Sequence, residues 1–204
     1  MSIILKACKF AAIKHKDQRR KNANADPYIN HPIDVANILL DIGVTNENVL
    51  AAAILHDTIE DTKTTYDELI AQFGLNIAMI VYECTDDKSL SKTSRKQKQI
   101  EHGSRMSNSA KLVKLADKLS NLSTIVHDPP KDWTAAEIDG SITWSFAVCN
   151  AIYLSTDANS LEYLAIAALY KQLSVIFGDL VNMAPDLVKK KLEAYYERLR
   201  LSNP

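Results

Sequence analysis

The chain has 204 residues, of which 47% are hydrophobic and 24% are charged, and its formal net charge is −1. This composition excludes a disordered or fibrous protein and fits a globular one with a sizeable core. A charge so close to zero argues against a general nucleic-acid coat or a polybasic membrane binder, although it leaves room for a local basic pocket.

The cellular setting is indicated by the cysteines and by the absence of targeting signals. Cys8, Cys84 and Cys149 are far apart and form no CxxC pair, so neither a disulfide scaffold nor a cysteine zinc site is expected. No stretch approaches the roughly 20 apolar residues that span a bilayer. Lys6 and Lys9 interrupt the apolar N-terminus, which predicts an amphipathic helix. We therefore expect a cytoplasmic protein that binds neither nucleic acid nor membrane.

Apolar residues recur at spacings of three and four along nearly the whole chain, and no alternating apolar and polar run appears, so we expect an all-α fold. Gly43, Gly74 and Gly178 follow apolar runs and predict helix ends, while Thr65 and Thr134 have the spacing of capping residues at helix starts. About ten helices are predicted, near residues 2–16, 32–42, 46–60, 65–73, 75–85, 93–101, 108–127, 134–154, 158–177 and 185–200.

The segment from Leu55 to Asp61 carries the first candidate for chemistry. It follows an apolar run and places His56 and Asp57 together at the end of a buried helix, where polar groups need partners. A divalent metal ion is one such partner, because imidazole and carboxylate are both good ligands. Glu60 lies one turn further along the predicted helix and would face the same cavity. An adjacent His-Asp pair is also common by chance, so a metal site is expected only if other segments supply further ligands.

Two other segments supply such ligands. His31 stands at the predicted start of a helix, and Asp117 stands beside the apolar stripe of the predicted helix 108–127, where an aspartate is rarely left unpaired. With His56 and Asp57 they make a mixed nitrogen and oxygen set, which fits manganese, iron or zinc better than calcium or magnesium.

The order His31, His56-Asp57, Asp117 resembles the HD metal-dependent phosphohydrolase superfamily. The flanking motifs are similar to the hydrolase half of RelA/SpoT proteins, above all to the stand-alone small alarmone hydrolases of the metazoan SpoT-homologue type. In chain order, these motifs are Gln18–Lys21, Pro27–Pro32, Leu55–Thr62, Thr85–Lys88 and Lys114–Leu122. The resemblance covers roughly residues 1–150. It implies an HD-domain helical hydrolase over residues 1–154, and we expect residues 155–204 to be C-terminal helices packed on that same domain.

The resemblance implies hydrolysis of guanosine tetra- or pentaphosphate, (p)ppGpp, at the 3′-pyrophosphate, which gives GDP or GTP and pyrophosphate. It implies manganese as the cofactor. The metal ligands would be His31, His56, Asp57 and Asp117. Glu60 and Asp61 would orient or deprotonate the attacking water. Without the resemblance, an equally good interpretation is that both carboxylates face solvent at a helix end or bind a nearby lysine.

The resemblance also implies a guanine-nucleotide site. Arg20 and Lys21 would lie beside the base and the phosphates, and Asn121 and Thr124 would contact the nucleoside; the alternative for the last two is an ordinary polar position on an amphipathic helix. An arginine can stack on a purine and a lysine can reach a phosphate. Two further groups of cations are expected on solvated faces: Arg95, Lys96 and Lys98, and Lys111, Lys114 and Lys118. Trp133 and Trp144 are expected in the core or at its edge.

Two other functions stay open. A NADPH 2′-phosphatase or another HD nucleotide phosphohydrolase would use the same chemistry, since NADPH also presents a purine, a ribose phosphate and a pyrophosphate. The basic Arg20-Lys21 pair favours a polyphosphorylated purine nucleotide over a monophosphate. A non-catalytic module that only binds alarmone would have no need of the complete ligand and carboxylate set. The sequence does not predict the oligomeric state.

Overall fold

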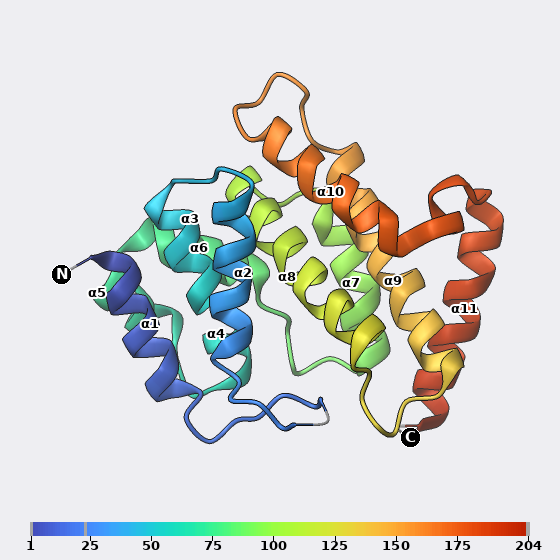
Figure 1. Ribbon diagram of the computed structural model, residues 1–204, viewed down its shortest axis with the longest axis horizontal. Helices are drawn as coiled ribbons and strands as arrows, with labels where there is room; N and C mark the ends of the chain where they lie inside the picture. Colours follow the sequence, from blue (N-terminus) through green and yellow to red (C-terminus); the bar gives the residue numbers. More distant parts are fainter. Residues whose placement is uncertain (1, 23, 203–204) are drawn as a thin grey trace.

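The computed structural model describes residues 2–22 and 24–202. Within them the chain forms eleven α-helices and one short 3-10 helix, with no β-strand, so the predicted all-α fold is confirmed (Figure 1). The helices are α1 (Ile3–Lys14), α2 (Asn30–Asp41), α3 (Glu47–Leu55), α4 (Thr58–Asp61), α5 (Tyr66–Phe73), α6 (Leu75–Cys84), α7 (Lys92–Gly103), α8 (Asn108–His127), α9 (Ala135–Leu154), α10 (Tyr163–Phe177), η1 (Gly178–Asn182) and α11 (Pro185–Ser202).

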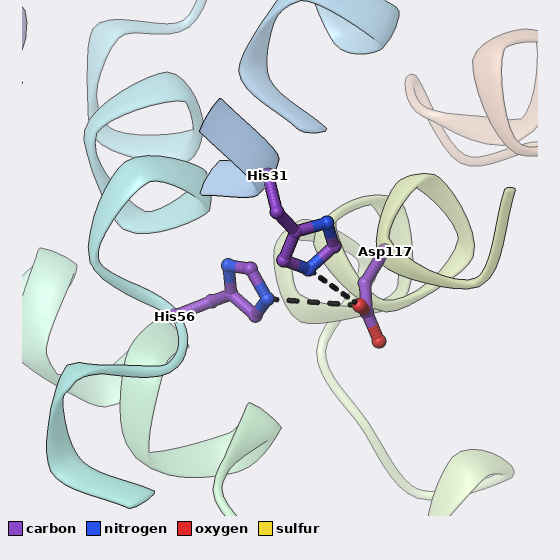
Figure 2. A group of neighbouring side chains, drawn as sticks. All are labelled: His31, His56 and Asp117. Carbon is purple, nitrogen blue, oxygen red and sulfur yellow. Dashed lines mark ion pairs between the residues drawn. The ribbon is translucent and has the colours of Figure 1, made fainter. Parts of the chain in front are cut away.

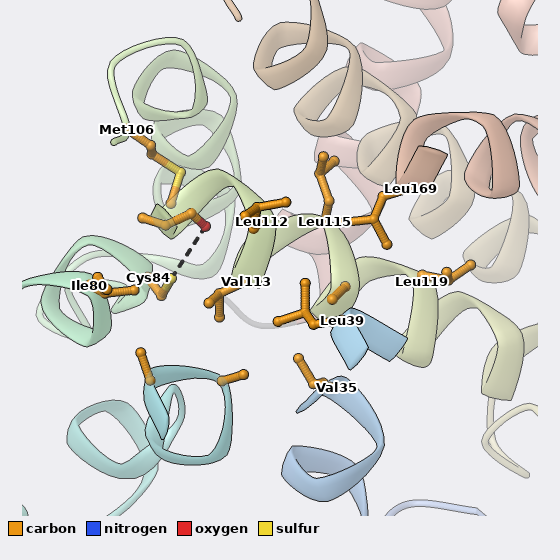
Figure 3. Close-up of a cluster of buried hydrophobic side chains, with 14 of the residues drawn as sticks. Val35, Leu39, Ile80, Cys84, Met106, Leu112, Val113, Leu115, Leu119 and Leu169 are labelled. Atoms are coloured by element: carbon orange, nitrogen blue, oxygen red, sulfur yellow. Dashed lines mark hydrogen bonds between the residues drawn. The ribbon is translucent and has the colours of Figure 1, made fainter. Parts of the chain in front are cut away.

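Helix α8 runs through the middle of the molecule, with α1 to α6 on one side of it and α9 to α11 on the other (Figure 1). Its apolar side chains interleave with those of α2, α6 and α10 (Figure 3). The side chains drawn there include Val35, Leu39, Ile80, Leu112, Val113, Leu115, Leu119 and Leu169. Each fully buried side chain of this size contributes about 1.5–3 kcal/mol. The packing therefore holds α8 firmly, and with it every polar residue that α8 carries inward.

The predicted helix 46–60 is wrong at its end, because the structure divides it into α3 and α4 at His56 and Asp57. Side chains take the backbone carbonyls that a continuing helix would use. The imidazole of His56 lies 2.7 Å from the carbonyl oxygen of Ala53, and the hydroxyl of Thr58 donates to the carbonyl of Leu55 at 2.7 Å. Local side-chain bonds of this kind compete with the helical ladder.

The helix predicted over 158–177 begins later, at Tyr163. The side chain of Asp157 accepts a hydrogen bond from the backbone N–H of Asn159 at 2.9 Å, and the hydroxyl of Ser160 donates to the carbonyl of Asp157 at 2.8 Å. These bonds stabilise a turn in place of a first helical turn. The two helices that follow pack on the rest of the chain, α10 against α8 and α9, and α11 against α9 and α7.

One run, Tyr163–Asn182, has the length and composition to cross a membrane, with a mean hydropathy of 1.5 over its most apolar window. No such run was expected from the sequence, in which Lys171 and Asp179 interrupt the apolar residues. Leu169 and Leu173 from this run belong to the core, although only 28% of the window is buried. Core helices of globular proteins pass the same test, so a single run of this kind is weak support for a membrane span.

The three lysines of α8 are buried, which overturns the solvated face expected for them. The ammonium group of Lys114 donates to the carbonyl of Cys84, the last residue of α6, at 2.8 Å. The ammonium group of Lys111 donates to the carbonyl of Ser155, just after α9, at 3.1 Å. Lys118 lies 4.3 Å from the ring centre of Trp144, which is buried as expected. The C-terminal carbonyls of helices favour cations, so these lysines join α8 to its neighbours.

Replacing Gly140 tests the packing of α9 against α11, because a Cβ at this position would overlap the ring of Tyr195. Glycine to alanine inside a helix ordinarily stabilises by about 0.5–1 kcal/mol. Here we expect Gly140→Ala to lower the free energy of unfolding by about 1–3 kcal/mol, as overpacking does, measured by chemical denaturation. In a Tyr195→Ala background the same change should be neutral or stabilising. A stabilised single variant would contradict this packing.

Candidate metal centre

Three side chains with metal-binding atoms converge from three separate elements: His31 from the first turn of α2, His56 from the break after α3, and Asp117 from the middle of α8 (Figure 2). Their ligand atoms all lie within 4.8 Å of one another. The Nε2 atoms of His31 and His56 lie 3.2 Å and 3.7 Å from Oδ1 of Asp117. The residues are only 4%, 3% and 7% exposed, so water does not satisfy this cluster.

The hydrogen bonding of His56 shows which nitrogen faces the cluster. A carbonyl oxygen only accepts, so the bond at 2.7 Å to Ala53 places the proton of the neutral ring on Nδ1 and leaves a lone pair on Nε2. Nε2 is buried, and no described residue is aligned to hydrogen-bond it. An imidazole fixed on one side and unsatisfied on the other is the arrangement that a metal ion completes. The cluster can therefore hold a metal ion.

Asp57 adds a second carboxylate beside the histidines. Its Oδ2 lies 3.1 Å from Nε2 of His56 and 3.7 Å from Nε2 of His31. The phenol of Tyr28 donates a hydrogen bond of 2.6 Å to the same oxygen. The four residues that the sequence nominated as ligands, His31, His56, Asp57 and Asp117, thus lie together. Their donor set combines imidazole nitrogen and carboxylate oxygen, which suits first-row transition metals.

Electrostatics keep the carboxylates of the cluster charged. Burial disfavours their charged forms, but Lys118 and the two imidazoles outweigh it and hold the pKa of Asp117 well below its usual range. In the same way, burial opposes protonation of His56, but the carboxylates of Asp57 and Asp117 raise the pKa of His56 to about 10. The ion-free cluster therefore attracts positive charge. A bound cation would replace the imidazolium proton.

Glu60 and Asp61 lie on the short helix α4, past the break. Glu60 accepts a hydrogen bond of 3.0 Å from the backbone N–H of Asp86, so its side chain contacts the loop after α6. Burial, and next the charge of Asp86, raise the pKa of Glu60. Asp61 forms an ion pair with Lys88, and its Oδ2 lies 3.3 Å from the phenol oxygen of Tyr28, whose single proton is directed mainly at Asp57. Tyr28 therefore lies between Asp61 and the candidate ligand Asp57.

A cavity of about 390 Å³ is connected to the cluster through Tyr28 and Asn121, which line it and hydrogen-bond to Asp57 and Asp117. It collects the residues that the sequence nominated for substrate, together with one carboxylate of α4 and two aromatic rings: Arg20, Lys21, Asn121, Thr124, Asp61, Tyr28 and Trp133. The guanidinium of Arg20 donates to Oδ1 of Asn121 at 2.8 Å, and the amide of Asn121 donates to Oδ1 of Asp117 at 2.6 Å. A continuous chain of hydrogen bonds therefore joins the cavity to the metal cluster.

A larger cavity, of about 620 Å³, lies between α6, α7 and the loop that joins them. Arg95 and Lys98 line it, along with acidic residues such as Glu83 and Glu101, so its walls have no clear sign of charge. None of the four cluster residues lines this cavity or the smaller one. Size alone therefore does not identify the substrate pocket; the link through Asn121 favours the smaller cavity.

Two aromatic residues of this site were not identified from the sequence. Tyr28 lies in the motif Pro27–Pro32, in the turn before α2, and its closeness in sequence to the candidate ligand His31 was the available signal. Trp133 was expected at the core or its edge, but it lines the smaller cavity. Trp133 follows a Pro-Pro pair after α8, and nothing in its sequence neighbours indicates that it lines a cavity.

A family model described as an HD domain matches residues 7–147. A protein from Xenopus tropicalis named guanosine-3′,5′-bis(diphosphate) 3′-pyrophosphohydrolase MESH1 is 47% identical over 152 residues, which are 74% of this chain and 85% of that protein. The human protein of the same name is 47% identical over 150 residues, or 73% of this chain and 84% of that protein.

A solved structure has a fold similar to that of this chain. It is described as a metazoan ortholog of SpoT that hydrolyzes ppGpp and plays a role in starvation responses. It superposes with a TM-score of 0.75 at 38% sequence identity and covers 84% of this chain and 96% of its own. The likeness therefore extends over most of both molecules.

Removing a ligand tests whether the cluster is a metal centre. We expect His56→Ala and Asp57→Ala to abolish metal retention, because each change removes a donor and leaves the other buried groups without their shared partner. The measurement is the metal content after manganese loading and desalting. His127→Ala, a change of an exposed histidine on α8, is the control and should retain metal. Metal retained by both cluster variants at the wild-type level would contradict the assignment.

Proposed function

The chain belongs to the HD domain family, and within it to the MESH1-type relatives of SpoT, and on that premise we propose that it is a metal-dependent (p)ppGpp 3′-pyrophosphohydrolase. The observation that carries the proposal is the hydrogen-bonded path from Arg20 through Asn121 to Asp117. It joins the cavity that Arg20 and Lys21 line to a buried cluster with metal-binding character, and a cationic pocket beside a metal ion suits hydrolysis of an anionic nucleotide.

His31, His56, Asp57 and Asp117 would hold the metal ion, and we propose manganese, which suits their mixed nitrogen and oxygen donors. When bound, such an ion polarises a phosphoryl group and lowers the pKa of its water towards about 7. The protein's own contribution is the orientation of the donors. The carbonyl of Ala53 fixes His56, and Asn121 holds Oδ1 of Asp117.

Glu60 is the group that we propose to take a proton from the attacking water. A general base works best when its pKa lies near the working pH, and burial raises the pKa of Glu60 in that direction. The hydrogen bond from the backbone of Asp86 sets the position of its carboxylate. Asp61, held by Lys88 and Tyr28, would orient the water.

The smaller cavity would take the nucleotide. Arg20 and Lys21 supply positive charge for the phosphates, and a guanidinium also stacks well on a purine. The ring of Trp133 offers a second flat surface, while Asn121 and Thr124 offer hydrogen-bonding groups to the nucleoside. Products of the 3′-pyrophosphate reaction would be pyrophosphate and GDP or GTP.

Product analysis tests the proposal directly. Purified protein loaded with manganese is incubated with guanosine tetraphosphate and, in parallel, with NADPH, each with a chelator control. We expect chelator-sensitive release of GDP and pyrophosphate. Release of phosphate from NADPH alone would move the assignment to the 2′-phosphatase. No turnover of either substrate, with alarmone binding intact, would overturn catalysis in favour of a binding module.

The role of Glu60 can be separated from metal binding. We expect Glu60→Gln to keep its metal and to lower kcat by about 10²–10⁴-fold, because the amide cannot accept the proton of water. Metal content and steady-state rates are measured on the same preparation. Glu47→Gln, the same change at an exposed position of α3, should leave both unaltered. Loss of metal from the Glu60 variant would contradict this division of roles.

A further inference from the structure

The second ring nitrogen of His31 has a side-chain partner. Nδ1 of His31 lies 3.0 Å from the hydroxyl oxygen of Ser120. Ser120 lies on α8, three residues after Asp117, so both occupy the same face of the helix. Its residue exposure is 4%. The opposite nitrogen of His31, Nε2, points at Asp117 (Figure 2). The ring of His31 is thus held between Ser120 on one side and Asp117 of the metal cluster on the other.

The hydroxyl of Ser120 also contacts a carboxylate. It donates a hydrogen bond of 2.5 Å to Oδ2 of Asp34, which lies on the exposed side of α2, three residues after His31. A hydroxyl has one proton, and an ionised carboxylate only accepts, so that proton is committed to Asp34. Towards His31 the hydroxyl can then act only as an acceptor. Nδ1 of His31 must therefore be the donor.

We propose that Ser120 and Asp34 form a relay that fixes the tautomer of His31 with the proton on Nδ1 and the Nε2 lone pair directed at the metal centre. The inference rests on the metal centre in the proposed function. Neither residue lies among the proposed ligands; both are positioning residues that act through His31. Asp34 sets the direction, because a serine hydroxyl alone could equally donate to Nδ1.

His31 and His56 differ in what orients their rings. His56 is oriented by the carbonyl of Ala53, a backbone acceptor that no substitution reverses. His31 instead depends on two side chains, and changing the acidic one can reverse the polarity of the whole relay. Outer partners of metal-binding histidines typically contribute about 10–100-fold to metal affinity.

The test measures Mn²⁺ binding to the full chain by competition with a chelating dye, without nucleotide. We expect Ser120→Ala and Asp34→Asn to raise the dissociation constant by about 10–100-fold. In the second variant the amide can donate to Ser120, which frees the hydroxyl to donate to Nδ1 and favours the tautomer whose Nε2 proton faces the centre. Ser120→Thr keeps the hydroxyl and should retain wild-type affinity.

Two controls and one spectrum separate positioning from general stability. Ser123→Ala on α8 and Asp41→Asn on α2 repeat the same chemical changes on the same helices and should leave affinity unaltered. In protein loaded with Co²⁺, the wild type and Ser120→Thr should show slowly exchanging, metal-shifted N–H proton signals from both His31 and His56. The signal from His31 should be lost or exchange rapidly in Asp34→Asn.

The outcomes distinguish the relay from the function. Wild-type affinity in Asp34→Asn, or an equal loss in the controls, would overturn the relay while leaving the metal centre in place. If the wild-type chain bound no Mn²⁺, the relay and the metal centre would fail together. Weak binding by the relay variants alone supports the relay, even if product analysis finds no hydrolysis.

Discussion

An ionised carboxylate in the middle of the most central helix is the constraint on which the architecture depends. Asp117 is buried, and an unpaired charge in such a place would destabilise the fold severely. Lys118 and two imidazoles face it, and the amide of Asn121 donates to it. The first turn of α2 and the end of α3 must both present a histidine to one point of α8. The packing of those helices and the chemistry of the site are therefore the same arrangement.

Much of the fold follows from local pattern, because the residues that cap helices and the spacing of apolar residues act over a few positions. Thr134, for example, forms the expected capping box with Glu137. The break at His56 did not follow, since the apolar period continues through it and only the competition of side chains for the carbonyls of Ala53 and Leu55 ends the helix. The buried Lys114 shows the same limit, because its acceptor belongs to another helix.

In the candidate site, too, some features could be predicted from the sequence and others could not. Residue types and their order predicted which side chains to examine, and those nominated for metal and for nucleotide lie in two adjoining groups. The contacts between them could not be predicted, because Arg20 and Asn121 are 101 positions apart in sequence and Ser120 and Asp34 are 86 apart. The identity of a hydrogen-bond partner depends on how helices are placed, and periodicity carries no such information.

The hydrogen bond between Arg20 and Asn121 has a consequence for affinity. Without nucleotide, the guanidinium already has a partner inside the cavity and lies 5.9 Å from the ring centre of Tyr28. A base that stacks on Arg20 and bonds to Asn121 has to displace this internal contact, so part of the interaction energy goes into exchanging partners. Such competition weakens ground-state binding and product retention alike. A uniform weakening of this kind raises KM and does not by itself change kcat.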